Sequence, residues 1–156
     1  SGADLLAIET QPCLREIAIL ADLVADIELP VWVSFCCRDA NHLHDGSPLG
    51  AAIAAVKDVK SVFAIGANCT APAHISEIMQ RVKQEAPDQR VIVYPNSGEI
   101  YDASTGTWRG LSELSVFERM AAEWIGEGAD IIGGCCRIGP AHIALLREQV
   151  EAARRS

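Results

Sequence analysis

The chain has 156 residues, 49% of them hydrophobic and 22% charged, a balance typical of a folded domain with a buried core. The formal net charge is −8, and no clustered basic face is visible, so we expect no nucleic-acid partner. The longest apolar runs, such as residues 62–65, are too short to cross a bilayer. No signal peptide is visible at the start, so we expect a cytoplasmic protein without a membrane partner.

Short apolar runs alternate with helical patterns along the whole chain. The predicted strands are residues 4–9, 30–35, 61–65, 90–94 and 129–132. The predicted helices are residues 12–26, 48–59 (capped by Ser47), 72–85, 114–126 and 140–154, several with proline in the first turn. This alternation predicts an α/β fold with a parallel sheet covered by helices, in one domain over residues 1–156.

Five β/α units are too few for a closed parallel barrel, which needs eight strands. The units could form an open doubly wound sheet or part of a larger barrel, and composition does not decide between these. Two units resemble each other, because Cys69 precedes Pro72-Ala73-His74 as Cys135 and Cys136 precede Pro140-Ala141-His142. The recurrence favours equivalent groups on one rim of the sheet, where strand C-termini meet.

The six cysteines are Cys13, Cys36, Cys37, Cys69, Cys135 and Cys136. Adjacent Cα atoms lie about 3.8 Å apart, below the usual range for a disulfide, so a secreted disulfide framework is not expected. Cys69, Cys135 and Cys136 each follow an apolar strand, after glycines that allow close backbone approach. Three converging thiolates would bind Zn²⁺ and leave its fourth position open. Small core residues at packed strand ends are the alternative, and spacing alone leaves both open.

Five segments occur in an order that carries a family resemblance. They are Glu9-Thr10-Gln11-Pro12, Ser34-Phe35, Gly66-Ala67-Asn68-Cys69, Tyr94-Pro95-Asn96-Ser97-Gly98-Glu99 with Tyr101-Asp102 and Trp108, and Gly133-Gly134-Cys135-Cys136-Arg137. Together they resemble the homocysteine S-methyltransferase family, especially its bacterial members that use S-methylmethionine. The resemblance spans essentially the whole chain. It implies the last five β/α units of a (β/α)₈ TIM barrel.

The resemblance also implies an activity and a site. A zinc-dependent methyltransferase of this kind moves a methyl group from S-methylmethionine, or from S-adenosylmethionine, to homocysteine and forms methionine. The implied zinc ligands are Cys69, Cys135 and Cys136, and Glu9 matches the position that holds the homocysteine amino group. Asn96 is expected to line the same rim and contact substrate. A free thiol is only about 3% thiolate at pH 7, and zinc coordination deprotonates it.

The chain departs from the family at its beginning, where nothing corresponds to the Asp-Gly-rich segment of the first three units. Exposed sheet edges would then favour self-association. A non-catalytic zinc-binding fragment or assembly subunit is therefore the alternative function. A Schiff-base aldolase is excluded, because the lysines (Lys57, Lys60 and Lys83) lie in or after helical patterns.

Other candidate residues are expected to be structural. Cys36 and Cys37 end a strand without a ligand role in the family, and Cys13 is expected to pack. His74 and His142 fall in first helical turns, where histidine more often caps or meets solvent than binds metal. Residues 42–45 resemble a metal motif, but the glycine and proline that follow indicate a polar loop.

Overall fold

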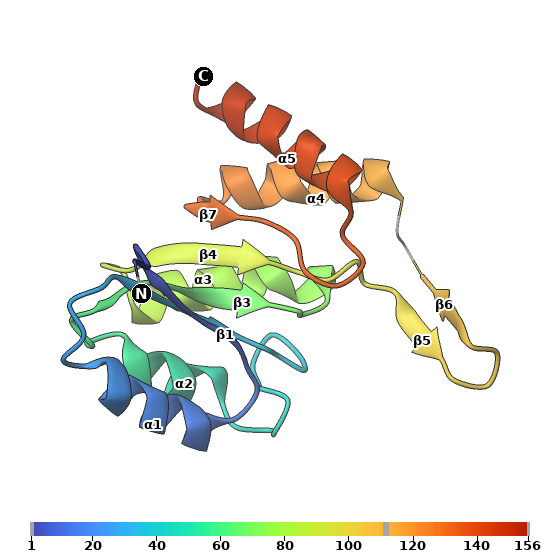
Figure 1. The fold of residues 1–156 in the computed structure, drawn as a ribbon. Helices are drawn as coiled ribbons and strands as arrows, with labels where there is room; N and C mark the ends of the chain where they lie inside the picture. The colour runs from blue at the N-terminus through green and yellow to red at the C-terminus, as the bar shows by residue number, and fades with distance from the viewer. Residues whose placement is uncertain (1, 111–112, 156) are drawn as a thin grey trace.

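The computed structural model describes residues 2–110 and 113–155, which form a curved parallel sheet with helices around it (Figure 1). The sheet has five strands in the order β1-β2-β3-β4-β7, and every neighbouring pair is parallel. The strands are β1 Leu6–Gln11, β2 Val31–Phe35, β3 Val62–Asn68, β4 Arg90–Tyr94 and β7 Ile131–Ile132. Strand order follows chain order, as expected for successive right-handed β/α units.

Each strand is followed by a helix or by a loop that leads to one. The helices are α1 Leu14–Val24, α2 Leu49–Val56, η1 Pro72–His74, α3 Ile75–Glu85, α4 Leu114–Gly126 and α5 Pro140–Ala153. In Figure 1, α1 and α2 lie beneath the sheet, α3 lies behind it, and α4 and α5 lie above it. The helices therefore curve around one face of the sheet. Among the described helices, none combines the length and apolar character that a membrane span requires.

The core lies between this outer face of the sheet and the helices. Val31, Val33 and Phe35 of β2 belong to the buried core, as do Val91 and Val93 of β4. Each fully buried side chain of this kind contributes about 1.5–3 kcal/mol to folding. Side chains alternate along a strand, so the residues between these point to the opposite, inner face of the sheet.

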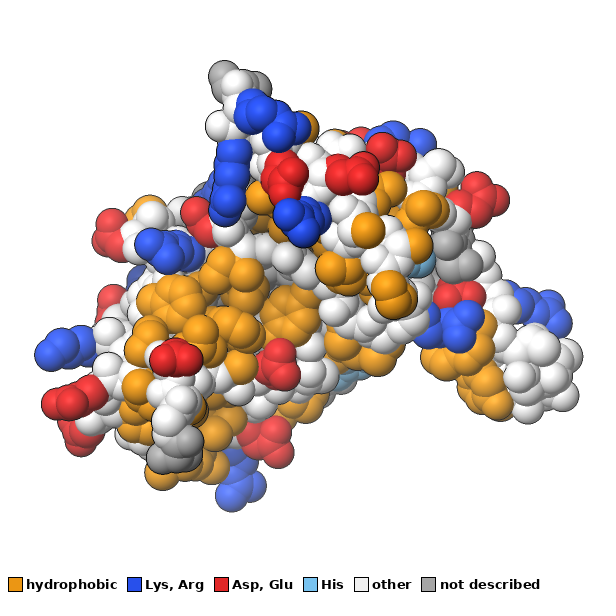
Figure 2. All heavy atoms as spheres, turned by 45° about the horizontal axis from the view of Figure 1, so that its top comes forward, with side chains coloured by type: hydrophobic (Ala, Val, Ile, Leu, Met, Phe, Trp, Pro, Cys, Tyr) orange, Lys and Arg blue, Asp and Glu red, His pale blue; other side chains and the backbone are white. Residues whose placement is uncertain are grey.

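The inner face carries polar side chains near the C-terminal ends of the strands. They are Glu9 of β1, Ser34 of β2, Asn68 of β3 and Tyr94 of β4. Figure 2 shows hydrophobic side chains gathered between the N-terminal segment and the C-terminal helix. The sheet thus has a helix-covered side and a side where polar groups cluster at one rim.

Several predicted boundaries need correction. The first and third strands extend to Gln11 and Asn68, so both reach further toward the rim than predicted. No strand or helix is predicted between residues 94 and 114, but this segment contains a hairpin of β5 Ile100–Asp102 and β6 Thr107–Arg109. Strands of three residues carry too little periodicity to be recognised from sequence.

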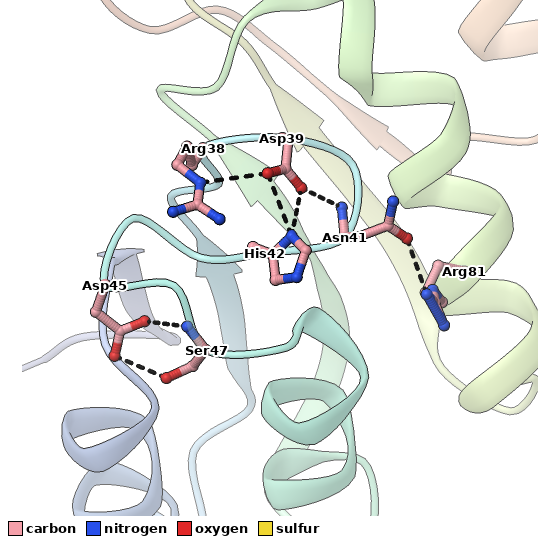
Figure 3. A network of polar contacts seen from close by, with 7 residues as sticks. All are labelled: Arg38, Asp39, Asn41, His42, Asp45, Ser47 and Arg81. Carbon is pink, nitrogen blue, oxygen red and sulfur yellow. Dashed lines mark hydrogen bonds and ion pairs between the residues drawn. The ribbon is translucent and has the colours of Figure 1, made fainter.

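Ser47 does not cap the second helix, which contradicts the prediction. The N-cap residue is Pro48, and the hydroxyl of Ser47 donates instead to Asp45 Oδ2 at 2.8 Å. Asp45 also accepts from the backbone N–H of Ser47 at 2.8 Å (Figure 3). It accepts a third bond of 3.2 Å from the backbone N–H of Leu14. Ser47 stands one residue before the N-cap, and its hydroxyl is turned toward the carboxylate of Asp45 rather than toward the first turn of the helix.

Candidate metal centre

The three cysteines expected to hold a metal lie together at the C-terminal rim of the sheet. Their Sγ atoms all lie within 4.8 Å of one another. The Sγ of Cys136 lies 3.4 Å from that of Cys69 and 4.0 Å from that of Cys135. Four sulfurs about 2.3 Å from a tetrahedral zinc would be about 3.8 Å apart, so these spacings fit that ion. All three cysteines are free thiols.

The backbone around β4 brings the two cysteine-bearing loops together. Cys69 follows β3, and its N–H donates to Tyr94 O at 3.3 Å. The loop after β7 lies on the other side of β4, where Cys135 N–H donates to Pro95 O at 2.8 Å and Cys136 O accepts from Ser97 at 3.1 Å. The end of β4 therefore serves as the spacer that sets the distance between the loops.

Backbone strain in the described residues gathers at this rim. The non-glycine residues with positive φ there are Thr10 at 58°, Cys69 at 51° and Arg137 at 63°. Each is a candidate ligand or stands beside a candidate site residue. A left-handed conformation costs a non-glycine residue about 1–3 kcal/mol and persists where surrounding contacts impose it. The left-handed conformation of these residues turns the chain sharply where the strands end, and so sets the direction of the neighbouring side chains at the rim.

The thiols resist ionisation as long as no cation lies among them. Burial raises the pKa of Cys69 above its ordinary value, and the adjacent thiols of Cys136 and Cys135 raise it further. Burial likewise raises the pKa of Cys36, with smaller contributions from the same two neighbours. Like charges at this separation disfavour one another. A divalent cation would remove that penalty, which is the chemical demand of a thiolate metal site.

Glu9 lies on the same rim, exposed at the end of β1. Its Oε1 accepts a hydrogen bond of 2.9 Å from the hydroxyl of Tyr94, which comes from β4 across the sheet. An exposed carboxylate held by a single hydroxyl keeps most of its acceptor sites open. It is therefore available to a cationic group that enters from the inner face.

Asn96 is half-buried in the loop after β4. Its Nδ2 donates to the carbonyl of Cys69 at 3.1 Å, and its Oδ1 accepts from the N–H of Gly98 at 2.9 Å. The side chain of Asn96 thus stabilises the loop that carries Cys69. Its predicted contact with substrate stays a prediction.

The sequence did not predict how the β5–β6 hairpin is attached to the rim that carries the three cysteines. Arg137 follows Cys136 directly, and its Nε and Nη2 both donate to the carboxylate of Glu99, the latter at 3.1 Å. This guanidinium lowers the pKa of Glu99 and lies 4.9 Å from the centre of the Trp108 ring. The sequence did contain a signal for this attachment: an arginine directly after the cysteine pair, with a glutamate and a tryptophan in the same family motif.

Three of the remaining cysteines and histidines make contacts within the fold that account for their positions. Cys37 is buried, and its N–H donates to Thr70 Oγ1 at 2.9 Å. His42 contacts Asp39 at 2.9 Å within the polar loop after β2, which is also tied to α3 by a bond from Arg81 to Asn41 (Figure 3). His142 accepts from the N–H of Gly139 at 3.2 Å at the start of α5, which confirms a capping role. Residues 42–45 belong to a loop, as expected.

A family model described as homocysteine S-methyltransferase matches residues 1–150. The chain is 38% identical to homocysteine S-methyltransferase YbgG of Bacillus subtilis over 92% of this chain and 45% of the relative. It is 41% identical to homocysteine S-methyltransferase of Escherichia coli over 94% of this chain and 48% of the relative. The chain therefore spans about half the length of the curated relatives it matches.

Solved structures point the same way. The apo form of homocysteine methyltransferase MmuM from Escherichia coli aligns with a TM-score of 0.76 at 36% identity, covering 95% of this chain and 50% of that one. Its metallated form aligns with a TM-score of 0.77 at 36% identity, covering 95% and 46%. With the family model spanning nearly the whole chain, this protein belongs to the homocysteine S-methyltransferase family.

Proposed function

We propose that this chain forms the zinc-binding part of an enzyme that transfers a methyl group from a sulfonium donor to homocysteine and yields methionine. The observation that carries the proposal is the convergence of three cysteine sulfurs within 4.8 Å, on a family member's strand ends. S-Methylmethionine is the first donor and S-adenosylmethionine the second. A metallated relative among the similar structures supports a metal at this site, and the all-sulfur ligand set supports zinc.

Zinc, when bound, supplies the positive charge that keeps thiols ionised at neutral pH and so makes a substrate thiolate available. Cys69, Cys135 and Cys136 would be its ligands, and three protein ligands leave one tetrahedral position for substrate sulfur. Their combined negative charge keeps an added sulfur electron-rich. Attack on a methyl carbon next to a sulfonium then needs positioning more than acid–base help, because the leaving group departs as a neutral thioether.

The chain's own residues would orient homocysteine on the inner face. Glu9 would accept the substrate ammonium group, with Tyr94 holding the carboxylate through the 2.9 Å hydrogen bond. Asn96 would line the rim next to the loop of Cys69. An ammonium anchored at one end and a sulfur held at the other would leave the substrate little rotational freedom at the reacting atom.

We further propose that the sheet is the last five units of a (β/α)₈ barrel. The edge strands β1 and β7 and the inner face would then be covered by three further units, in line with relatives of about twice this length. A sheet edge that no such unit covers would favour self-association. The free cysteines fit a reducing compartment, so the cytoplasm is the proposed location.

The test measures metal content and turnover together. Purified chain is assayed for zinc by elemental analysis and for methionine formation from homocysteine and S-methylmethionine, alone and with added protein comprising the further units that the longer relatives have. We expect about one zinc per chain, and turnover only in the complemented sample. Cys135→Ala should lose most of the zinc at unchanged secondary structure, whereas Cys13→Ala, outside the cluster, should keep it.

The outcomes separate this proposal from its alternative. Zinc without turnover in the complemented sample would favour a non-catalytic zinc-binding fragment or assembly subunit. Full zinc retention in Cys135→Ala, or a folded chain that binds no zinc, would refute the ligand assignment.

A further inference from the structure

Asn68 is a buried polar residue whose contacts the proposed reaction does not yet explain. Its side chain is only 2% exposed, at the end of β3 on the inner face. Its Oδ1 accepts from Thr10 N–H at 2.8 Å and from the Ser34 hydroxyl at 2.7 Å. Its Nδ2 donates to Thr10 Oγ1 at 2.7 Å and to Cys135 Sγ at 3.8 Å. One amide therefore joins β1, β2 and the loop after β7 through every donor and acceptor it has.

The contacts with Thr10 hold the carboxylate of Glu9 in place. Thr10 has a φ of 58°, a conformation that disfavours a β-branched residue, and it follows Glu9 directly. Asn68 binds both the backbone N–H and the hydroxyl of this one residue. Two partly buried hydrogen bonds of this kind contribute about 1–3 kcal/mol together, enough to offset strain of the same size. The direction in which Glu9 leaves the strand thus depends on Asn68.

The same Nδ2 that donates to Thr10 also donates to the sulfur of Cys135, one of the proposed zinc ligands. A thiolate accepts hydrogen bonds readily, and an N–H aimed at a metal-bound sulfur orients it and moderates its charge. Asn68 precedes Cys69 in sequence yet its amide points to the cysteine across β4. It can therefore set the position of the second loop relative to the first.

A second route connects the same two ends of the site. Tyr94 donates to Glu9, and the hydroxyl of Ser34 contacts both the Tyr94 hydroxyl and Asn68 Oδ1. Ser34 is fully buried, so its hydroxyl has no exchange with bulk water to weaken these contacts. Each hydroxyl carries one proton, so two of these three contacts are hydrogen bonds at a time, and together they link Glu9 indirectly to Asn68.

We propose that Asn68 is a positioning residue that fixes the distance and orientation between the carboxylate of Glu9 and the sulfur of Cys135. This inference rests on the proposed function, in which the first group binds the substrate ammonium and the second binds zinc. Asn68 touches neither substrate nor metal. It acts through the two groups that do.

The test compares Asn68→Asp and Asn68→Ser with Ser34→Ala. The aspartate keeps an oxygen for Thr10 and Ser34 but turns a carboxylate oxygen toward the sulfur in place of an N–H. The serine is too short to reach the sulfur and keeps the site neutral, so it serves if the buried aspartate impairs folding. Ser34→Ala removes a buried hydrogen bond to the same amide and leaves the N–H···S contact, so it controls for a purely structural loss.

Three properties are measured for each protein: urea unfolding of the metal-free chain, metal affinity by chelator competition, and the sulfur-to-cobalt charge-transfer absorption of the Co²⁺-loaded chain. We expect both Asn68 variants to bind metal about 10- to 100-fold more weakly, the usual effect of losing a partner of a metal ligand. Their charge-transfer band should move to longer wavelength, because a sulfur without its N–H donor holds its lone pair less tightly. Ser34→Ala should weaken metal binding less than either Asn68 variant and keep the wild-type band position, because the N–H···S contact of Asn68 remains.

The results distinguish the two proposals. A wild-type chain that binds no metal would overturn the proposed function and this inference with it. A wild-type chain that binds metal, beside Asn68 variants with unchanged affinity and band, would overturn the inference and leave the proposed function standing. Equal losses in Ser34→Ala and the Asn68 variants would also overturn it, since the effect would then follow from stability alone.

Discussion

Zinc should stabilise this chain unevenly, and mostly at its C-terminal edge. The metal would link the loop after β3 to the loop after β7, across the intervening strand β4. The edge strand β7 is the weaker partner, because only Ile131 and Ile132 pair with β4 and both are half-buried. The helix α5 that follows has only Leu146 among its buried residues. Because β7 pairs with the sheet through only two residues, this edge gains most from the link.

The size of the effect follows from mass action. A ligand at 100 times its dissociation constant stabilises the folded state by about 2.7 kcal/mol when it binds only that state. For a domain of this size, each kcal/mol raises Tm by about 2–4 °C, so the expected rise is about 5–11 °C. Cys135→Ala should show less than about 2 °C, because two thiols no longer enclose the ion.

The measurement combines thermal unfolding at buffered free zinc with hydrogen exchange resolved along the chain. Added zinc should slow exchange most in β7 and the start of α5, and least in α1 and α2, which lie on the far flank of the sheet (Figure 1). Cys13→Ala provides the matched control, since it removes a thiol away from the cluster. Uniform protection along the chain, or a full Tm rise in Cys135→Ala, would refute the proposed link.

Three further predictions concern single residues of the sheet and rim. Gly66→Ala should cost at least about 1–3 kcal/mol of unfolding free energy in urea titrations, because an added Cβ would lie 1.6 Å from a backbone carbonyl oxygen of β4. Burial raises the pKa of Tyr94 to about 12, so wild-type stability relative to Tyr94→Phe should be constant up to about pH 9 and fall as pH rises past the unfolded value near 10. Arg137→Leu should free the hairpin, seen as changed Trp108 fluorescence; in the wild type the same change should appear only on acidification through the lowered pKa of Glu99. No difference between variant and wild type in these measurements would contradict each argument in turn.

Patterns that repeat along the chain predicted the architecture well. The strand at residues 90–94 and the helix at 114–126 have the predicted bounds, because each is a long apolar or amphipathic run between clear turn residues. Strand direction placed Cys69, Cys135 and Cys136 on one rim, where the structure brings their sulfurs together. Spacing alone left metal binding and core packing open, and the family resemblance was needed to choose these three as a ligand set.

Individual hydrogen bonds and individual backbone dihedral angles could not be predicted from these patterns. The position of Ser47 before a helical pattern predicted a helix cap, but in the structure its hydroxyl donates to the carboxylate of Asp45. Thr10 adopts a left-handed conformation that is unfavourable for its residue type, and it is held there by two hydrogen bonds from the distant amide of Asn68. In sequence, Asn68 looks like the polar end of a strand and nothing more.

The same contrast explains why the rim can be both strained and specific. Positive φ at Thr10, Cys69 and Arg137 is unfavourable locally, so each residue must be held by contacts that come from elsewhere in the fold. Those contacts are the amide of Asn68 for Thr10, the carbonyl of Tyr94 for Cys69 and the carboxylate of Glu99 for Arg137. Each of these supports reaches its partner from a different segment of the chain. The geometry of the rim that carries the three cysteines therefore depends on the whole assembled sheet. A substitution in any one of these supports should change the positions of the cysteine side chains.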